Sequence, residues 1–226
     1  MSNETSKTKK IWSQKEIDYL KGDGIDIGCG NDPVFSHVIP FDKEHGDANQ
    51  ISKYFPNKKL DFVFSSHCLE HMIQPENALK EWFSILKPGG YLFVIVPDED
   101  LYEQGHFPSK YNDDHKWTFT ISKRKSWSNK SKNILELAHM LTENNSGQLV
   151  QVELQDMNFD YKIHKFNKGW FSHRLWRWFK KVSRPFKDTS IETYLSRFYS
   201  CLGSSFDQTF MGGDRLAQIQ FIIRKN

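Results

Sequence analysis

Short continuous apolar runs along the chain alternate with segments in which apolar residues recur every three or four positions. Short apolar segments predict strands at 24–28, 37–41, 60–65, 91–96, 148–154 and 217–223, and the consecutive apolar residues 62–64 indicate a strand that is covered on both faces. Helical spacing predicts helices at 11–20, 75–86 and 130–141. A strand, a helix and a strand in succession between 60 and 96 form a parallel unit, which predicts an open, doubly wound α/β sheet.

The pattern also suggests how the chain is divided. Residues 1–10 are polar and rich in lysine, so we expect a flexible, solvated arm. Residues 11–226 show no repeat and no break in composition, and we expect a single domain. Between the last two predicted strands lies an insertion, 168–202, that is both basic and aromatic.

Composition narrows the function classes. The net charge is only +3, which gives no support for a nucleic-acid-binding protein. The three cysteines are widely spaced and form no CxxC pair, so we expect neither a disulfide framework nor a zinc finger. No apolar run is long enough to span a bilayer and no secretory signal is recognisable, so a cytoplasmic location is predicted.

Candidate chemistry gathers where the predicted strands end. Asp26-Ile27-Gly28-Cys29-Gly30 follows the first strand, and glycines there allow a ligand to approach the backbone closely. Asp42 ends the second strand, Asp47-Ala48 follows shortly after, and the segment 65–71 (SSHCLEH) ends the third. Because ligands bind beyond the carboxyl ends of parallel strands, these groups should meet at one edge of the sheet.

The set DIGCG, SSHCLEH and LKPGGYLFVIVP resembles the class I S-adenosylmethionine-dependent methyltransferases, and the likeness covers roughly residues 24–97. The resemblance implies a Rossmann-like domain with a mostly parallel seven-stranded sheet and an antiparallel last strand at 217–225. It implies S-adenosylmethionine as the cofactor, with Asp26, Gly28 and Gly30 at its methionine end, Asp42 at its ribose, and Asp47 with Ala48 at its adenine. The full set of expected cofactor contacts is Asp26, Ile27, Gly28, Cys29, Gly30, Asn31, Asp42, Lys43, Asp47, Ala48, Ser65, Ser66 and His67.

One feature departs from that family. Asp26 and Asp42 are only 16 positions apart, and Asn31-Asp32-Pro33 interrupts the segment where the family has a full helix. A pyrophosphate needs the start of that helix and a third glycine, so the short connection weakens a nicotinamide-dependent oxidoreductase as the alternative. A sulfonium cofactor carries no phosphate and does not need them.

Acceptor-side residues are expected after the strand at 91–96. His115 is the first candidate for a base, because its ordinary pKa suits proton transfer. His67 and Tyr102 are the other catalytic candidates. The expected acceptor contacts are Asp98, Tyr102, His106, His115, Trp117 and Arg174. We expect no metal, because the adjacent Asp113 and Asp114 read as solvated loop residues, and His71 is expected to make a structural hydrogen bond.

The insertion leaves three roles open. Its aromatic and basic residues between 170 and 182 could form a lid over the acceptor, cover a sheet edge or a homodimer interface, or lie on an anionic membrane surface.

The sequence excludes one class of methyl acceptor, and a resemblance to known methyltransferases implies another. Amino methyltransferases that modify bases need an Asn/Asp-Pro-Pro-Tyr/Phe signature where this chain has Ser-Ser-His-Cys. The chain is similar to methyltransferases of bacterial surface-glycan and capsule assembly, which implies O-methylation of a sugar, a phosphorylated sugar or a phosphate-bearing precursor. A catalytically silent partner subunit of the same fold stays open as a further alternative.

Overall fold

The computed structural model describes residues 4–164, 166, 178–179, 181–186, 189–201, 207–210 and 214–226. Its centre is a six-stranded sheet in the order β2-β1-β3-β4-β8-β7. These strands are β1 (Gly24–Ile27), β2 (Ile39–Phe41), β3 (Leu60–Ser66), β4 (Leu86–Pro97), β7 (Gly147–Gln155) and β8 (Gln218–Lys225). The last strand, β8, pairs antiparallel with both β4 and β7, while β1, β2, β3 and β4 pair in parallel.

The doubly wound α/β class and the antiparallel last strand are therefore confirmed, but the expected strand count of seven is wrong. The main sheet has six strands among the described residues, and β5 (Thr118–Thr120) with β6 (Ser131–Asn133) forms a separate two-stranded sheet. The connection from β1 to β2 also contains no helix. The expected shortening of that segment is confirmed.

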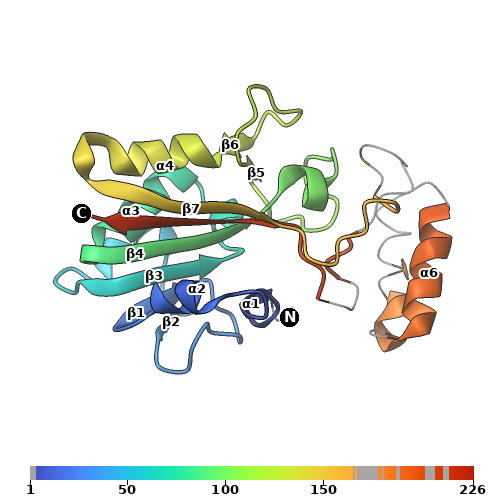
Figure 1. The fold of residues 1–226 in the computed structure, drawn as a ribbon, viewed down its shortest axis with the longest axis horizontal. Helices are drawn as coiled ribbons and strands as arrows, with labels where there is room; N and C mark the ends of the chain where they lie inside the picture. The colour runs from blue at the N-terminus through green and yellow to red at the C-terminus, as the bar shows by residue number, and fades with distance from the viewer. Residues whose placement is uncertain are drawn as a thin grey trace.

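Helices cover the main sheet on both faces (Figure 1). On one face lie α3 (Pro75–Ser84) and α4 (Ile134–Thr142), and on the other lie α1 (Glu4–Lys9) and α2 (Gln14–Asp18). Because α3 has apolar residues at helical spacing, it buries Ala78, Leu79, Trp82 and Phe83 in the larger core cluster. Full burial of such side chains stabilises the fold by roughly 1.5–3 kcal/mol each.

The predicted elements differ from the observed ones mainly at their ends. The first helix covers only Gln14–Asp18, and the helix expected to end at 86 ends at Ser84. The segment 130–141 divides into β6 and α4, since Asn133 caps α4 by accepting the backbone N–H groups of Leu135 and Glu136.

The short helical turns complete the described elements. They are η1 (Ala48–Lys53), η2 (Leu69–His71), η3 (Glu99–Glu103), η4 (Glu143–Asn145) and η5 (Arg184–Phe186). Two of them, η2 and η3, follow the carboxyl ends of β3 and β4 and carry the chemistry described below.

The flexible N-terminal arm is a wrong prediction for residues 4–10. Helix α1 docks on the domain through Thr8, whose side chain is fully buried. The Thr8 hydroxyl accepts a 2.8 Å hydrogen bond from Gln218 Nε2, and Lys7 Nζ donates to the Thr209 carbonyl over 2.8 Å. These partners are about two hundred positions away in the sequence, so the local pattern could not reveal them.

The insertion is described only in part. Helix α6 (Ser190–Cys201) lies beyond the carboxyl ends of the parallel strands, apart from the main sheet (Figure 1). Phe179 is buried in a small cluster with Tyr111, while Trp178 is exposed. Arg174, and with it most of the segment 170–182, lies outside the described residues. Among the helices that are described, none has the length and apolar character required to cross a membrane.

Candidate active site

The loop after β1 is shaped by glycine. Gly28 has a φ of +81°, and a Cβ there would lie 2.5 Å from the Cβ of Cys68. Gly30 has a φ of +53° but an open position, with only Asp42 Oδ2 at 4.0 Å from its ideal Cβ. Since only glycine adopts such backbone without cost, the sequence Gly-Cys-Gly fixes a tight loop against the start of η2.

A cavity of about 630 Å³ opens beside this loop, and we call it the glycine-loop cavity. It is bounded by the ends of three neighbouring strands and by a loop after η3. The lining includes Gly28, Asp42, Lys43, Asp47, Ala48, His67, His71 and Asn112.

Asp42 is held with its carboxylate toward this loop. Its Oδ2 accepts a 2.8 Å hydrogen bond from the Gly30 N–H, and its Oδ1 accepts one of 2.6 Å from the Lys43 N–H. A carboxylate has about four acceptor sites, so each oxygen retains one for a ligand hydroxyl. Asp47 caps η1, where hydrogen bonds from the Asn49 side chain and backbone lower the pKa of Asp47.

Asp26 lies behind the loop and does not line the cavity. Its carboxylate is 1% exposed, and Oδ2 accepts a 2.7 Å hydrogen bond from the Val34 N–H. Burial raises the pKa of Asp26 to about 7, although the Val34 hydrogen bond opposes that shift. The position suits a residue that shapes the loop from beneath.

Other expected cofactor residues also support the loop from outside the cavity. Ser65 Oγ donates a 2.9 Å hydrogen bond to the Ile27 carbonyl, which ties β3 to β1. Ile27, Cys29 and Ser66 are buried, and burial raises the pKa of the Cys29 thiol to about 11, which disfavours the reactive thiolate near neutral pH. Asn31 does not line the cavity either.

A second cavity, of about 830 Å³, adjoins the first, and we call it the histidine cavity. It shares His67, His71 and Asn112 with the glycine-loop cavity. The rest of its described lining comes from α1 and Lys10, from η2 and η3, from the loop 111–115, and from Arg184, 207–210 and Asp214. These residues are Glu4, Ser6, Lys7, Lys10, Glu70, Tyr102, Tyr111, His115, Arg184, Asp207, Thr209, Phe210 and Asp214.

Three imidazole rings surround one buried carboxylate at the junction of the cavities. Oε1 of Glu70 lies 3.6 Å from His67 Nδ1, 3.9 Å from His71 Nε2 and 3.9 Å from His115 Nε2. Glu70 is fully buried, and neither of its oxygens has a hydrogen-bond partner among the described residues. Burial alone would raise the pKa of Glu70, but the neighbouring imidazoles hold it below its ordinary value.

The histidines themselves titrate differently. Burial opposes the charged form of His67, but contact with Glu70 and its negative charge raises the pKa of His67 to about 9. Burial lowers the pKa of His71, against the opposing charge of Glu70. Near neutral pH, His67 therefore favours the charged form and His71 the neutral one.

A second buried carboxylate orients His115. His115 Nδ1 lies 2.6 Å from Glu103 Oε1, and Tyr102 stacks on the His115 ring with centroids 5.4 Å apart. Tyr102 and Glu103 both belong to η3. The site therefore depends on how firmly η3 is held.

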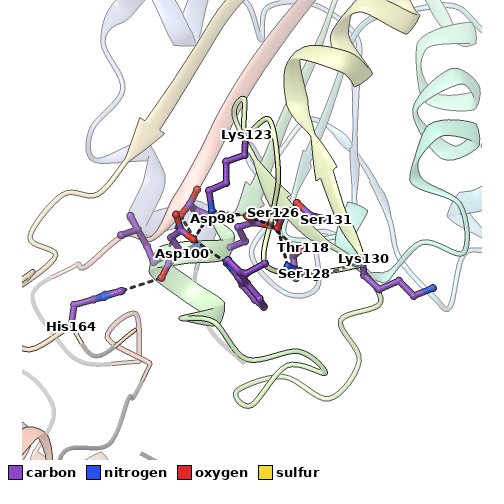
Figure 2. A network of polar contacts seen from close by, with 12 residues as sticks. Asp98, Asp100, Thr118, Lys123, Ser126, Ser128, Lys130, Ser131 and His164 are labelled. Carbon is purple, nitrogen blue, oxygen red and sulfur yellow. Dashed lines mark hydrogen bonds and ion pairs between the residues drawn. The ribbon is translucent and has the colours of Figure 1, made fainter. Parts of the chain in front are cut away.

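A polar network holds η3 in place (Figure 2). Fully buried Glu99, at the start of η3, accepts hydrogen bonds from Thr118, Lys123, Ser126 and Ser131 at 2.6–3.0 Å. Lys123 also bridges to Asp100, and His164 Nε2 donates to the Asp100 carbonyl. The network joins η3 to the β5–β6 segment.

Several expected acceptor residues lie away from the histidine cavity. Asp98 caps η3 through the N–H groups of Asp100 and Leu101, and burial raises its pKa to about 6. Trp117 Nε1 donates to the Met72 carbonyl over 3.0 Å, with Lys132 Nζ 4.2 Å from its ring centroid. His106 lines neither cavity, and Arg174 lies outside the described residues.

Comparison with known proteins now decides the family. A family model described as a methyltransferase domain matches residues 14–151, which is more than half of the chain. The chain belongs to the methyltransferase-domain family.

The expected methyltransferase family is thereby confirmed. The methyltransferase is similar along 99% of its length to the crystal structure of a SAM-dependent methyltransferase from Archaeoglobus fulgidus, with 95% of that chain covered, a TM-score of 0.52 and 18% identity. That likeness shows the fold.

The curated relatives match over a short stretch. Ubiquinone/menaquinone biosynthesis C-methyltransferase UbiE of Vibrio campbellii is 30% identical over 69 residues, which is 30% of this chain and 27% of the relative. The same enzyme of Vibrio vulnificus is 27% identical over 77 residues, or 34% of this chain and 30% of the relative. The chain thus matches less than a third of the length of either relative.

The methyltransferase contains site residues that sequence reasoning missed. Glu70 and Glu103 received no role, although both are buried beside His115. The spacing His67-x-x-Glu70-His71 could have revealed Glu70, because it places three polar groups on one short turn. Nothing local could have revealed Glu103, since its partner is twelve positions away. The structural hydrogen bond expected for His71 is confirmed, as its Nδ1 donates to the Asp114 carbonyl.

Proposed function

We propose that this methyltransferase methylates an oxygen of a small polar acceptor: a sugar, a phosphorylated sugar or a phosphate-bearing precursor of a surface glycan. One observation carries the proposal. The glycine-loop cavity and the histidine cavity share His67, His71 and Asn112, so ligands in the two cavities would meet at these residues. In-line transfer requires such a junction, because the two reacting groups must be held close together.

The residues present fit S-adenosylmethionine in the glycine-loop cavity. Gly28 leaves no room for a side chain, and Asp42 keeps free acceptor sites for the hydroxyls of a ribose. Asp47 and Ala48 line the same cavity, where they would meet the adenine, and Lys43 lines it as well. The cofactor, when bound, supplies an electrophilic methyl group on a sulfonium.

The described lining of the histidine cavity favours a polar acceptor. Lys7, Lys10 and Arg184 contribute positive charge that suits a phosphate, with Lys7 paired to Glu4 and Lys10 to Asp214. The carboxylates of Asp207 and Asp214 can accept from hydroxyl groups. Rings of Tyr102, Tyr111 and Phe210 offer flat apolar surfaces. A lining with this much charge does not suit the apolar ring of a quinone precursor.

His115 is the residue that we assign to activating the acceptor hydroxyl. Glu103 fixes its Nδ1 as the protonated nitrogen, so its Nε2 is directed toward the junction and Glu70. Tyr102 stacks on the same ring, and His67 lines both cavities. These positions support the catalytic roles expected for the three residues.

A screen of acceptors with methyl-labelled cofactor tests this proposal. Sugars and their phosphates are compared side by side, with His115→Gln as the test variant and the exposed His139→Gln as its matched control. We expect label on at least one sugar or sugar phosphate, lost in the first variant and kept in the second. Label transferred only to a quinone-type ring carbon would contradict the proposal, and transfer to nothing would favour a catalytically silent subunit.

A further inference from the structure

Each of the three histidines around Glu70 turns one ring nitrogen toward that carboxylate and the other toward a hydrogen-bond acceptor. In each ring, the nitrogen far from Glu70 is bonded to an acceptor. His71 Nδ1 lies 3.1 Å from the Asp114 carbonyl, and His115 Nδ1 lies 2.6 Å from Glu103 Oε1. These nitrogens therefore carry the protons of the neutral rings, because a carbonyl and a carboxylate can only accept.

The ring of His67 is also oriented by a hydrogen-bond acceptor, the side chain of a buried glutamine. Its Nε2 lies 3.0 Å from Gln218 Oε1. Gln218 Nε2 donates to Thr8 Oγ1 and Gln155 Oε1, which fixes the orientation of the amide and leaves its oxygen to accept from His67. The other ring nitrogen of His67, Nδ1, is the one that faces Glu70.

Three imidazole nitrogens thus face one buried carboxylate, and neither oxygen of that carboxylate has a hydrogen-bond partner among the described residues. A second buried carboxylate, Glu103, lies on the far side of His115, and its Oε2 also has no partner among the described residues. Two buried carboxylates on either side of one imidazole ring are unfavourable unless positive charge balances them.

We propose that Glu70, His71 and His115 bind a divalent transition-metal ion at the junction of the two cavities. One donor atom of each residue lies within 4.8 Å of the other two. Metal bonds of about 2.0–2.2 Å would bring such atoms to roughly 3–3.5 Å from one another, so small side-chain movements close the site. His67 Nδ1, 3.6 Å from the same Glu70 oxygen, is a further donor on the cofactor side.

The donor set selects the class of metal. Two imidazoles and one carboxylate suit Zn²⁺, Co²⁺ or Fe²⁺, whereas Mg²⁺ and Ca²⁺ prefer sites built of oxygen. The contact between His115 and Glu103 is the outer carboxylate–histidine pair that orients metal-binding histidines. Three protein ligands leave a coordination position for an oxygen from outside the chain.

All three proposed ligands line the histidine cavity, where the proposed acceptor would lie, so the open position would be reached from that cavity. His115 would then activate the acceptor hydroxyl by holding the cation that binds it, rather than by taking the proton itself. This role rests on the proposed function, whereas metal binding itself does not.

Cobalt absorption measures the binding directly. The full chain is freed of metal with a chelator, dialysed and titrated with Co²⁺, whose visible bands report nitrogen ligands. We expect one equivalent to bind, Zn²⁺ to displace it and a large excess of Mg²⁺ to leave it in place. Glu70→Gln and His71→Gln should each weaken binding at least tenfold, and His139→Gln should not.

Two outcomes overturn the inference. One is the absence of a Co²⁺ spectrum, which would mean that protons alone balance Glu70. The other is equal binding by the wild type and the His71→Gln variant, which would place the ion elsewhere. His71 is partly exposed, so this variant should fold even where Glu70→Gln does not. Binding of S-adenosylhomocysteine, measured on the same samples, separates failure of the metal site from failure of the proposed function.

Discussion

The Nδ1 atom of His115 lies 2.6 Å from Oε1 of Glu103, and both side chains are almost fully buried. This contact directs His115 Nε2 toward the junction of the two cavities. Because η3 carries Glu103 and the β5–β6 segment holds η3 through Glu99, the orientation of the ring depends on residues on three elements.

Replacing Glu103 should lower the rate of methyl transfer without changing how tightly the cofactor binds. In Glu103→Gln the amide can still meet His115 but no longer holds a negative charge beside the ring. We expect the methyl-transfer rate to fall about 10- to 100-fold, with unchanged affinity for S-adenosylhomocysteine. Rate measurements with labelled cofactor check the transfer rate, and titration calorimetry checks the affinity for S-adenosylhomocysteine. A parallel loss of cofactor affinity would point to general damage to the fold.

The glycine loop offers a matched pair of substitutions. Gly28→Ala places a Cβ 2.5 Å from Cys68 at a φ of +81°, so something must move. We expect the free energy of unfolding to fall by about 2–3 kcal/mol and cofactor affinity to fall with it. Gly30→Ala meets open space and should cost about 1 kcal/mol, from its positive φ alone. Equal losses in urea unfolding would show that the contact with Cys68 does not constrain the loop.

Asp26 should make stability depend on pH in an unusual direction. Its pKa in the folded chain is about 7, above the ordinary value for an aspartate, so the folded state keeps a proton that the unfolded state has already released. Stability should therefore fall as pH rises from about 4 to about 7, and level off above that. Urea unfolding at several pH values, for the wild type and Asp26→Asn, measures the difference. The variant should lose this part of the slope, and parallel slopes would contradict the assignment.

The order of elements could be predicted from sequence because it depends on local patterns. Apolar runs located the six strands of the main sheet, and helical spacing located α3, although their ends shifted by a few residues. Asp42, Asp47 and His67 meet as expected, since parallel strand ends share an edge of the sheet. Docking of α1, the pairing of Glu103 with His115, and the position of Asp98 as a cap depend on contacts between distant segments. No local pattern shows such contacts.

The Glu99 network should contribute to stability more than a surface ion pair does. Glu99→Gln keeps the size of the side chain but removes the charge facing Lys123 and one or more hydrogen bonds from the surrounding hydroxyls. We expect the free energy of unfolding to fall by about 2 kcal/mol. Glu143→Gln, at an exposed position on η4, is the control and should change stability little. If both variants unfold at the same urea concentration, the network does not hold η3.

Titration calorimetry with S-adenosylhomocysteine tests the central claim most directly, because it asks whether the glycine-loop cavity binds the cofactor. We expect one equivalent to bind the wild type, and Asp42→Ala to bind about 10- to 100-fold more weakly, since it loses charge-assisted hydrogen bonds to the ribose. Asp18→Ala, an exposed carboxylate on α2, should bind like the wild type. A wild-type chain that does not bind S-adenosylhomocysteine, or an Asp42→Ala variant with unchanged affinity, would contradict the assignment of this site.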